Sequence, residues 1–188
     1  MSSNTILIVD DDEMIRILLC QALSKEPYTL LEAESGISAM DMCDVHHPDV
    51  VLLDVNLPDI NGFEVCKFIR NSKYGADIPI IMVTGMDDTQ SIEQAYEYGA
   101  TDFIIKPINW YLISHHIRYI IRTSNHLKAL RKSEQKLEHA QDFARLGYWE
   151  LNVKKDHLSF SKQLTKLLGI SCSHFEFGLD YLLMLIHP

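Results

Sequence analysis

The sequence predicts an α/β protein built around an open, doubly wound sheet of five parallel strands. Two patterns predict this fold. Several apolar runs of strand length are continuous rather than alternating, and segments of helical periodicity lie between them. A parallel strand that helices cover on both faces is apolar throughout, because its successive side chains point to opposite faces. Strand and helix alternate along the chain, as they do in an α/β fold.

Four strong apolar runs predict buried strands, and one weaker run predicts a fifth. The strong runs are Ile6–Val9, Val50–Leu53, Ile80–Val83 and Phe103–Ile105, and the weaker run is Tyr28–Leu31. The segments of helical period are Met14–Ser24, Ile37–Val45, Phe63–Arg70 and Thr89–Tyr98. Residues typical of turns and helix ends separate these elements, namely Pro27, Pro48, Pro58, Asn61-Gly62 and Gly99.

A chain of 188 residues is long enough for one domain and a smaller second unit. We expect a first domain over residues 1–122, a helical linker over 123–144 and a second segment over 145–188. Apolar residues at helical spacing run from Ile108 to Leu137, but the heptad frame breaks. Two interpretations of this segment therefore stay open. It is either a signalling or linker helix, or a helix whose first half covers the sheet and whose second half is a solvated tether. Short strands and a helix are expected after Gly147, at Tyr148–Leu151 and Phe160–Leu168.

Charge and composition exclude several classes of protein. Residues 1–107 carry 6 Lys and Arg against 19 Asp and Glu, so the first domain would repel nucleic acid. No helix-turn-helix pattern follows it, and we expect no nucleic-acid partner for this segment. The chain also lacks an apolar run of the ~18 residues that a membrane helix needs, and it starts without a signal-peptide pattern. We therefore expect a cytoplasmic protein with no membrane partner.

The four cysteines are Cys20, Cys43, Cys66 and Cys172, and they lie far apart. None of them has a second Cys or a His at the spacing of a zinc site. Buried, reduced thiols are the prediction.

A polar residue follows each strong strand: Asp10, Asp54, Thr84 and Lys106. The carboxyl ends of parallel strands meet at one edge of an open α/β sheet, where ligands bind. We therefore expect these side chains to converge there, together with Asp11. Carboxylates a few ångström apart raise one another's pKa unless a cation neutralises them, and Mg²⁺ prefers oxygen ligands. A lysine and a hydroxyl beside such a site suit phosphoryl transfer, which needs positioning and charge neutralisation.

Four segments of the sequence resemble the defining motifs of response-regulator receiver domains, over residues 5–122. They are Ile-Leu-Ile-Val-Asp10-Asp11-Asp12, Leu-Leu-Asp54-Val-Asn56-Leu-Pro58-Asp-Ile-Asn-Gly62, Val-Thr84-Gly and Ile-Ile-Lys106-Pro107. The resemblance implies a flavodoxin-like sheet with strand order 2-1-3-4-5. It also implies a two-component switch whose partner is a sensor histidine kinase or a phosphotransfer protein. Such a domain assists its own phosphorylation and dephosphorylation but is not otherwise an enzyme.

The same resemblance assigns roles around a magnesium ion. Asp54 would be the nucleophile and phosphoacceptor and Asp11 a direct metal ligand. Asp10 would be a supporting acid, acting through water, and the carbonyl of Asn56 would complete the protein ligands. Lys106 would pair with the phosphoryl oxygens.

Two further residues are expected to form the switch. Thr84 would follow the phosphoryl group inward, and Phe103 would swing into the space it leaves. The family often has a tyrosine at the position of Phe103, so this chain departs from the pattern and lacks that hydroxyl. The resemblance also implies a cis Lys106-Pro107 bond. Asp12 is expected at the N-terminus of the first helix, where the helix dipole favours it.

Two alternative functions compete with the receiver hypothesis. A phosphatase of the haloacid dehalogenase type also uses a strand-end Asp, a Thr and a Lys. That family has a D-x-D pattern at its nucleophile, whereas this chain has Asp54-Val-Asn56. The other alternative is an interaction module that keeps the fold without being phosphorylated. The pair His115-His116 suggests a phosphorelay histidine, but neighbouring histidines on an amphipathic helix are more often surface residues.

The tail resembles the opening of a PAS sensor domain. The resemblance rests on Leu-Gly-Tyr-Trp149-Glu-Leu, Phe160-Ser, Leu-Leu-Gly169-Ile and Leu-Ile-His187-Pro188. It implies an incomplete PAS domain over residues 145–188 and a PAS-containing output. Half a PAS sheet leaves apolar residues uncovered, and we expect a homodimer or packing onto the linker helix to cover them.

Overall fold

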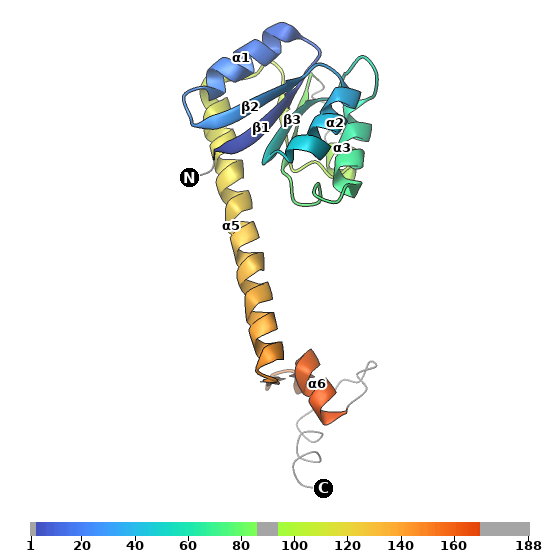
Figure 1. The fold of residues 1–188 in the computed structure, drawn as a ribbon, viewed down its shortest axis with the longest axis vertical. Coiled ribbons are helices and arrows are strands. Elements are labelled where there is room, and N and C mark those ends of the chain that lie inside the picture. The colour runs from blue at the N-terminus through green and yellow to red at the C-terminus, as the bar shows by residue number, and fades with distance from the viewer. Residues whose placement is uncertain (1–2, 86–93, 170–188) are drawn as a thin grey trace. The chain divides into compact units, whose positions relative to one another are not determined.

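The computed structural model describes residues 3–85 and 94–169 (Figure 1). The chain divides into two compact units, Met1–Leu127 and Lys128–Pro188. Helix α5, Trp110–Phe143, contributes to both of them. The division of the sequence at residues 122 and 144 stays a prediction.

The first unit contains a five-stranded parallel sheet in the order β2-β1-β3-β4-β5. Its strands are β1 Asn4–Val9, β2 Tyr28–Ala33, β3 Val50–Asp54, β4 Ile80–Thr84 and β5 Asp102–Ile105. The connecting helices are α1 Glu13–Leu23, α2 Gly36–His46 and α3 Gly62–Asn71. The predicted fold and strand order are confirmed. The helix expected over Thr89–Tyr98 lies partly outside the described residues, of which 94–97 are helical.

Helices cover both faces of the sheet and so bury two separate cores. On β1, Leu7 and Val9 belong to the core under α2 and α3, while Ile6 and Ile8 belong to the core under α1 and α5. β3 and β4 alternate between the two cores in the same way. This double burial explains the continuous apolar runs of β1, β3 and β4.

β2 and β5 are the two edge strands of the sheet. The weaker apolar pattern of β2 agrees with an edge position. The prediction that Phe103–Ile105 is a buried strand is wrong: β5 pairs only with β4, is half-buried, and has Ile105 40% exposed.

Side-chain caps fix where the helices begin. Asp12 is the N-cap of α1, and its carboxylate accepts a hydrogen bond from the Met14 amide at 2.8 Å, which confirms its predicted place. The carboxylate of Asp59, in the loop after β3, accepts from the amides of Gly36 and Ile37 at 2.8 and 2.9 Å. The hydrogen bond from Ile37, followed by that from Gly36, lowers the pKa of Asp59 to about 2. Asp59 thus ties the loop after the site-bearing strand to the start of α2.

The cysteines within the described residues are free thiols, and Cys43 and Cys66 are buried as predicted. Burial raises the pKa of Cys43 to about 12 and that of Cys66 to about 11. Cys20 on α1 is half-buried, and Cys172 lies outside the described residues.

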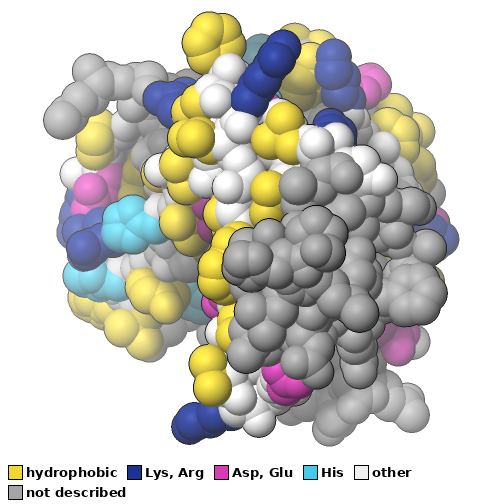
Figure 2. Space-filling view, turned by 90° about the horizontal axis from the view of Figure 1, so that it is seen from below, with side chains coloured by type: hydrophobic (Ala, Val, Ile, Leu, Met, Phe, Trp, Pro, Cys, Tyr) yellow, Lys and Arg dark blue, Asp and Glu magenta, His cyan; other side chains and the backbone are white. Residues whose placement is uncertain are grey.

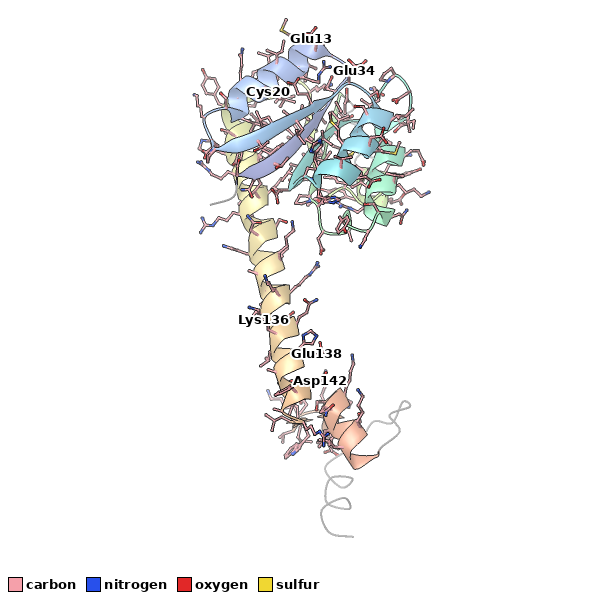
Figure 3. All side chains as sticks on the ribbon, viewed as in Figure 1. Glu13, Cys20, Glu34, Lys136, Glu138 and Asp142 are labelled. Atoms are coloured by element: carbon pink, nitrogen blue, oxygen red, sulfur yellow. The ribbon has the colours of Figure 1, made fainter. Side chains whose placement is uncertain are left out.

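Helix α5 is 34 residues long, which corresponds to about 50 Å. Its early residues Ile113, Ile117, Ile120 and Ile121 are buried against the sheet. From Leu127 onward its leucines are largely exposed. The face of the molecule drawn in Figure 2 has hydrophobic side chains beside polar and charged ones. Lys136, Glu138 and Asp142 project from the later turns (Figure 3). Among the described residues, no helix is both long and apolar enough to cross a membrane.

The second unit contains an antiparallel hairpin, β6 Trp149–Asn152 and β7 His157–Phe160, followed by α6 Lys162–Leu168. The prediction that Phe160 begins a helix is wrong. Phe160 is paired with Trp149 in the hairpin, and Ser161 is the N-cap of α6, accepting a hydrogen bond from the Leu164 amide. The expectations for residues 170–188 fall outside the described residues.

Gly62 lets α3 start directly against the end of β3. A Cβ atom at Gly62 would overlap the carbonyl oxygen of Asp54 and lie 2.9 Å from Cα of Val55. We expect Gly62→Ala to lower the free energy of unfolding by about 3 kcal/mol, because backbone must move to admit the methyl group. Urea unfolding measures this change. The matched control is Gly85→Ala, since a Cβ there meets no atom of the described residues within 4 Å; equal effects of the two substitutions would contradict the argument.

Candidate functional site

The strand register brings the predicted site residues to one edge of the sheet. β1 and β3 pair with Val9 opposite Leu53. The next residue in each segment, Asp10 after Val9 and Asp54 after Leu53, therefore lies at the carboxyl end of its strand, beside the other. On the far side of β3, Asp54 lies opposite Val83, one residue before Thr84. The Lys106 amide donates to the carbonyl of Thr84 at 2.7 Å, which holds the end of β5 beside the end of β4.

Lys106 joins the two buried carboxylates. Its Nζ lies 2.9 Å from Oδ2 of Asp10 and 2.9 Å from Oδ2 of Asp54. Asp10 is 2% exposed and Asp54 4% exposed, whereas the Lys106 side chain is 25% exposed. The peptide bond between Lys106 and Pro107 is cis, as predicted. Two buried acids therefore share one ammonium group at the rim of the sheet.

Asp11 completes a group of three carboxylates. One carboxylate oxygen from each of Asp10, Asp11 and Asp54 lies within 4.8 Å of the others, and Asp11 is the exposed member. Three ionised carboxylates beside one ammonium group leave two negative charges uncompensated. A divalent cation carries the matching charge, and carboxylate oxygens are the ligands that Mg²⁺ prefers. The residues therefore fit a magnesium ion that is open to solvent on the Asp11 side.

Burial and neighbouring charges act on the site in opposite directions. Burial raises the pKa of Asp54 above its ordinary value, and the nearby Asp10 carboxylate adds to the rise, while Lys106 opposes it. For Lys106, burial lowers the pKa, but its hydrogen bonds and ion pairs with Asp54 and Asp10 outweigh this and raise it. Lys106 is therefore held protonated, and Asp54 needs positive charge nearby to stay ionised.

The other predicted residues lie around this group. Thr84 is 5% exposed at the end of β4, and the amide of Asn56 lies 3.4 Å from Oδ1 of Asp54. Phe103 is half-buried on β5 and meets the Tyr96 ring edge-on, with ring centroids 6.1 Å apart. The metal-ligand role of Asn56 and the switch roles of Thr84 and Phe103 stay predictions.

Arg16 is a site neighbour that the sequence analysis missed. Its guanidinium donates to the carbonyl oxygen of Asp10 at 2.9 Å and lies 3.4 Å from that of Asp11. Backbone carbonyls carry no sequence signal, so the pattern of α1 alone gave no indication of this contact.

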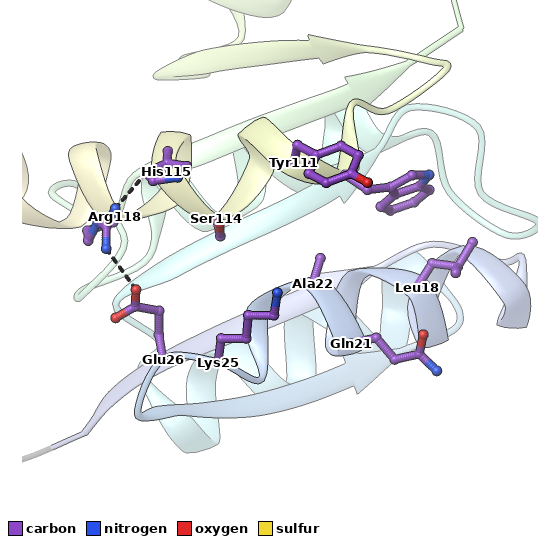
Figure 4. Close-up of a pocket in the computed structure, with 10 residues that line it drawn as sticks. Leu18, Gln21, Ala22, Lys25, Glu26, Tyr111, Ser114, His115 and Arg118 are labelled. Atoms are coloured by element: carbon purple, nitrogen blue, oxygen red, sulfur yellow. Dashed lines mark hydrogen bonds and ion pairs between the residues drawn. The ribbon is translucent and has the colours of Figure 1, made fainter.

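A separate hollow lies between α1 and α5 (Figure 4). Leu18, Ala22 and Tyr111 line it, and at one end Arg118 pairs with Glu26 at 2.8 Å and with His115 at 2.6 Å. The hollow contains none of the strand-end residues. His116 lies 2.8 Å from Asp102 in a second pair. His115 thus pairs with Arg118 on α5 and His116 with Asp102 on β5, and this geometry gives the phosphorelay alternative no support.

The doubly wound sheet in the order 2-1-3-4-5, with its acidic group at the carboxyl edge, defines a flavodoxin-like α/β fold, and comparison with known proteins identifies the family. A model of the response regulator receiver domain matches residues 6–118, more than half of the chain. The protein belongs to the response regulator receiver family.

Three known proteins illustrate the similarity. A protein named "Probable transcriptional regulator ycf27" from Cyanophora paradoxa is 30% identical over 171 residues, which cover 91% of this chain and 68% of the relative. The alkaline phosphatase synthesis transcriptional regulatory protein PhoP of Bacillus subtilis is 33% identical over 152 residues, covering 81% and 61%. The structure of chemotaxis protein CheY4 from Vibrio cholerae has a TM-score of 0.61 at 27% identity, covering 63% of this chain and 99% of that one.

The comparisons support the receiver domain but not the predictions made for the rest of the chain. The family match ends at residue 118, and the relatives are named as transcriptional regulators, so nothing here supports the PAS interpretation of residues 145–188. The same names leave the expected absence of a nucleic-acid partner unconfirmed.

Replacement of Asp54 by Asn should stabilise the metal-free protein at neutral pH. A carboxyl whose pKa is raised on folding contributes fully to stability below its ordinary value of 3.8, and that contribution is lost as pH rises through the folded pKa. The gain in the free energy of unfolding should therefore grow as pH rises above 3.8, which urea unfolding in the presence of a chelator measures.

Asp59→Asn is the matched control for this measurement, with the opposite sign. The pKa of Asp59 is lowered to about 2, so its carboxylate stabilises the fold above the ordinary value of 3.8 and loses this effect as pH falls toward 2. At neutral pH the Asn variant should be less stable than the wild type. A destabilised Asp54→Asn protein at neutral pH would contradict the burial argument.

Proposed function

We propose that this protein is the switch component of a two-component system and that Asp54 accepts a phosphoryl group from a sensor histidine kinase or a phosphotransfer protein. The observation that carries the proposal is the contact of Lys106 with both buried carboxylates at 2.9 Å. Membership of the receiver family supports it.

The chemistry follows from the positions of the side chains. A carboxylate oxygen of Asp54 attacks phosphorus, a new oxygen–phosphorus bond forms, and the bond to the donor breaks with its electron pair leaving on the donor. Lys106 is placed to exchange its contact with Asp54 for the incoming phosphoryl oxygens. Asp10 retains Lys106 during this exchange, since it is bonded to the same ammonium group. Thr84, at the neighbouring strand end, is proposed to donate a hydrogen bond from its hydroxyl to a phosphoryl oxygen.

A divalent ion bound by Asp10, Asp11, Asp54 and the Asn56 carbonyl would neutralise charge on the phosphoryl group. Asn56 cannot transfer a proton as a carboxyl group can, so hydrolysis of the aspartyl phosphate should be slow. A persistent phosphoryl group suits a signal better than turnover, which separates this proposal from a phosphatase. Repacking of Thr84 and Phe103 would then pass the change toward α5 as a shift between existing conformations.

Two kinds of output module compete for the second unit. A hairpin followed by a short helix is compatible with the start of a PAS domain, and we propose this output from the sequence resemblance. Relatives named as transcriptional regulators favour a DNA-binding output instead. Retardation of DNA fragments by the phosphorylated full-length protein would decide for the second.

Incubation with acetyl phosphate and Mg²⁺ should give one phosphoryl adduct per chain. Intact-mass measurement should show the adduct in the wild type and in Asp59→Asn, and not in Asp54→Ala or after chelation of the metal. A folded wild-type protein that forms no adduct would favour the phosphorylation-independent interaction module. Rapid, continuing release of phosphate from a generic phosphate ester would favour the phosphatase.

Lys106→Ala should slow adduct formation by about 100-fold, because it removes the fixed positive charge that faces the incoming phosphoryl oxygens. The time course of the mass shift measures the rate. Lys25→Ala is the matched control, since Lys25 lies in the α1–α5 hollow, away from the strand ends (Figure 4). Equal rates in Lys106→Ala and the wild type would show that the ammonium group does not act in the transfer.

A further inference from the structure

The side chain of Arg16 on α1 contacts the backbone of the loop between β1 and α1, which we call the acidic loop. The loop runs from the end of β1 at Val9 to the start of α1 at Glu13, and it carries Asp10 and Asp11. The Arg16 side chain is 13% exposed, and one of its terminal nitrogens donates to the Asp10 carbonyl at 2.9 Å, with the Asp11 carbonyl at 3.4 Å. A charged guanidinium is a strong donor to carbonyl oxygens, so this contact holds the two peptide units on either side of Asp11.

The other side of the guanidinium faces β2. Its buried Nε lies 3.4 Å from Oε2 of Glu32 and makes no hydrogen bond within the described residues, so the pairing is ionic. Glu32 is nearly half exposed, and an exposed ion pair contributes little by itself. The main contact of Arg16 is therefore the one with the loop, and Glu32 sets the direction of the planar group.

The rest of the loop is held from the opposite direction. Oδ1 of Asp10 accepts a hydrogen bond from the Asp12 amide at 2.9 Å, and the Asp12 carboxylate caps α1. These bonds fix Asp10 and Asp12. The position of the exposed Asp11 carboxylate depends on the backbone of the loop, and Arg16 contacts that backbone at the Asp11 carbonyl.

We propose that Arg16 is a positioning residue for the divalent cation, acting through the backbone of residues 10 and 11 to preset the Asp11 carboxylate. This inference rests on the proposed metal-dependent function and deepens it. Removal of a positive charge near a cation site should tighten cation binding by Coulomb's law, whereas loss of a positioning contact should weaken it.

Titration calorimetry with Mg²⁺ at fixed ionic strength tests the proposal on the full chain. We expect Arg16→Ala to raise the dissociation constant about 10-fold, the lower end for loss of a residue that orients metal ligands. Arg16→Lys should also weaken binding, because an ammonium group keeps the charge but lacks the planar fork. Arg118→Ala, which removes a positive charge from the Glu26 ion pair, should leave binding within about twofold of wild type.

The outcomes separate the possible failures. An Arg16→Ala protein that folds and binds Mg²⁺ as tightly as the wild type, or more tightly, overturns the proposal. A lower thermal midpoint with unchanged affinity also overturns it, because the role would then be structural only. If Arg16→Ala does not fold, Arg16→Lys decides the question by the same comparison. Absence of Mg²⁺ binding in the wild type would overturn the proposed function itself, and this inference with it.

Discussion

The site depends on the burial of two carboxylates next to a single ammonium group. Asp10 and Asp54 are almost fully buried, and Lys106 contacts both of them. Buried charges of like sign are costly unless they are paired, so the contact with Lys106 is what offsets the burial of both carboxylates. The two apolar cores hold the strand ends at this separation, because side chains of each strand that leads to the site pack on both faces of the sheet. The same arrangement leaves an excess of negative charge that a cation would relieve.

Much of this could be predicted from the sequence because the signals were redundant. Continuous apolar runs gave the parallel sheet, and the polar residue after each run gave the edge at which Asp10, Asp54 and Lys106 meet. Turn residues fixed most boundaries to within one or two positions. The resemblance to receiver domains, rather than any pattern of composition, supplied the strand order and the cis bond before Pro107.

The misses have physical reasons of their own. Arg16 is a lone cation in a helix, and its partners are carbonyl groups that every residue has, so nothing in the sequence distinguishes it from a solvated side chain. Phe160 was assigned to the helix together with Leu164, Leu167 and Leu168, although Ser161 is a good N-cap and marks the true start. The contact of Asp59 with α2 joins residues far apart in sequence, and such pairs have no local signal.

Helix α5 contains neither proline nor glycine between Trp110 and Phe143. Sharp bends in helices almost always need one of these residues, a bulge or an inserted side chain, so the sequence of this segment marks no kink. Because an α-helix has 3.6 residues per turn, an insertion of about four residues would keep the later side chains on nearly the same face of the helix. An insertion of about two residues would move them to the opposite face.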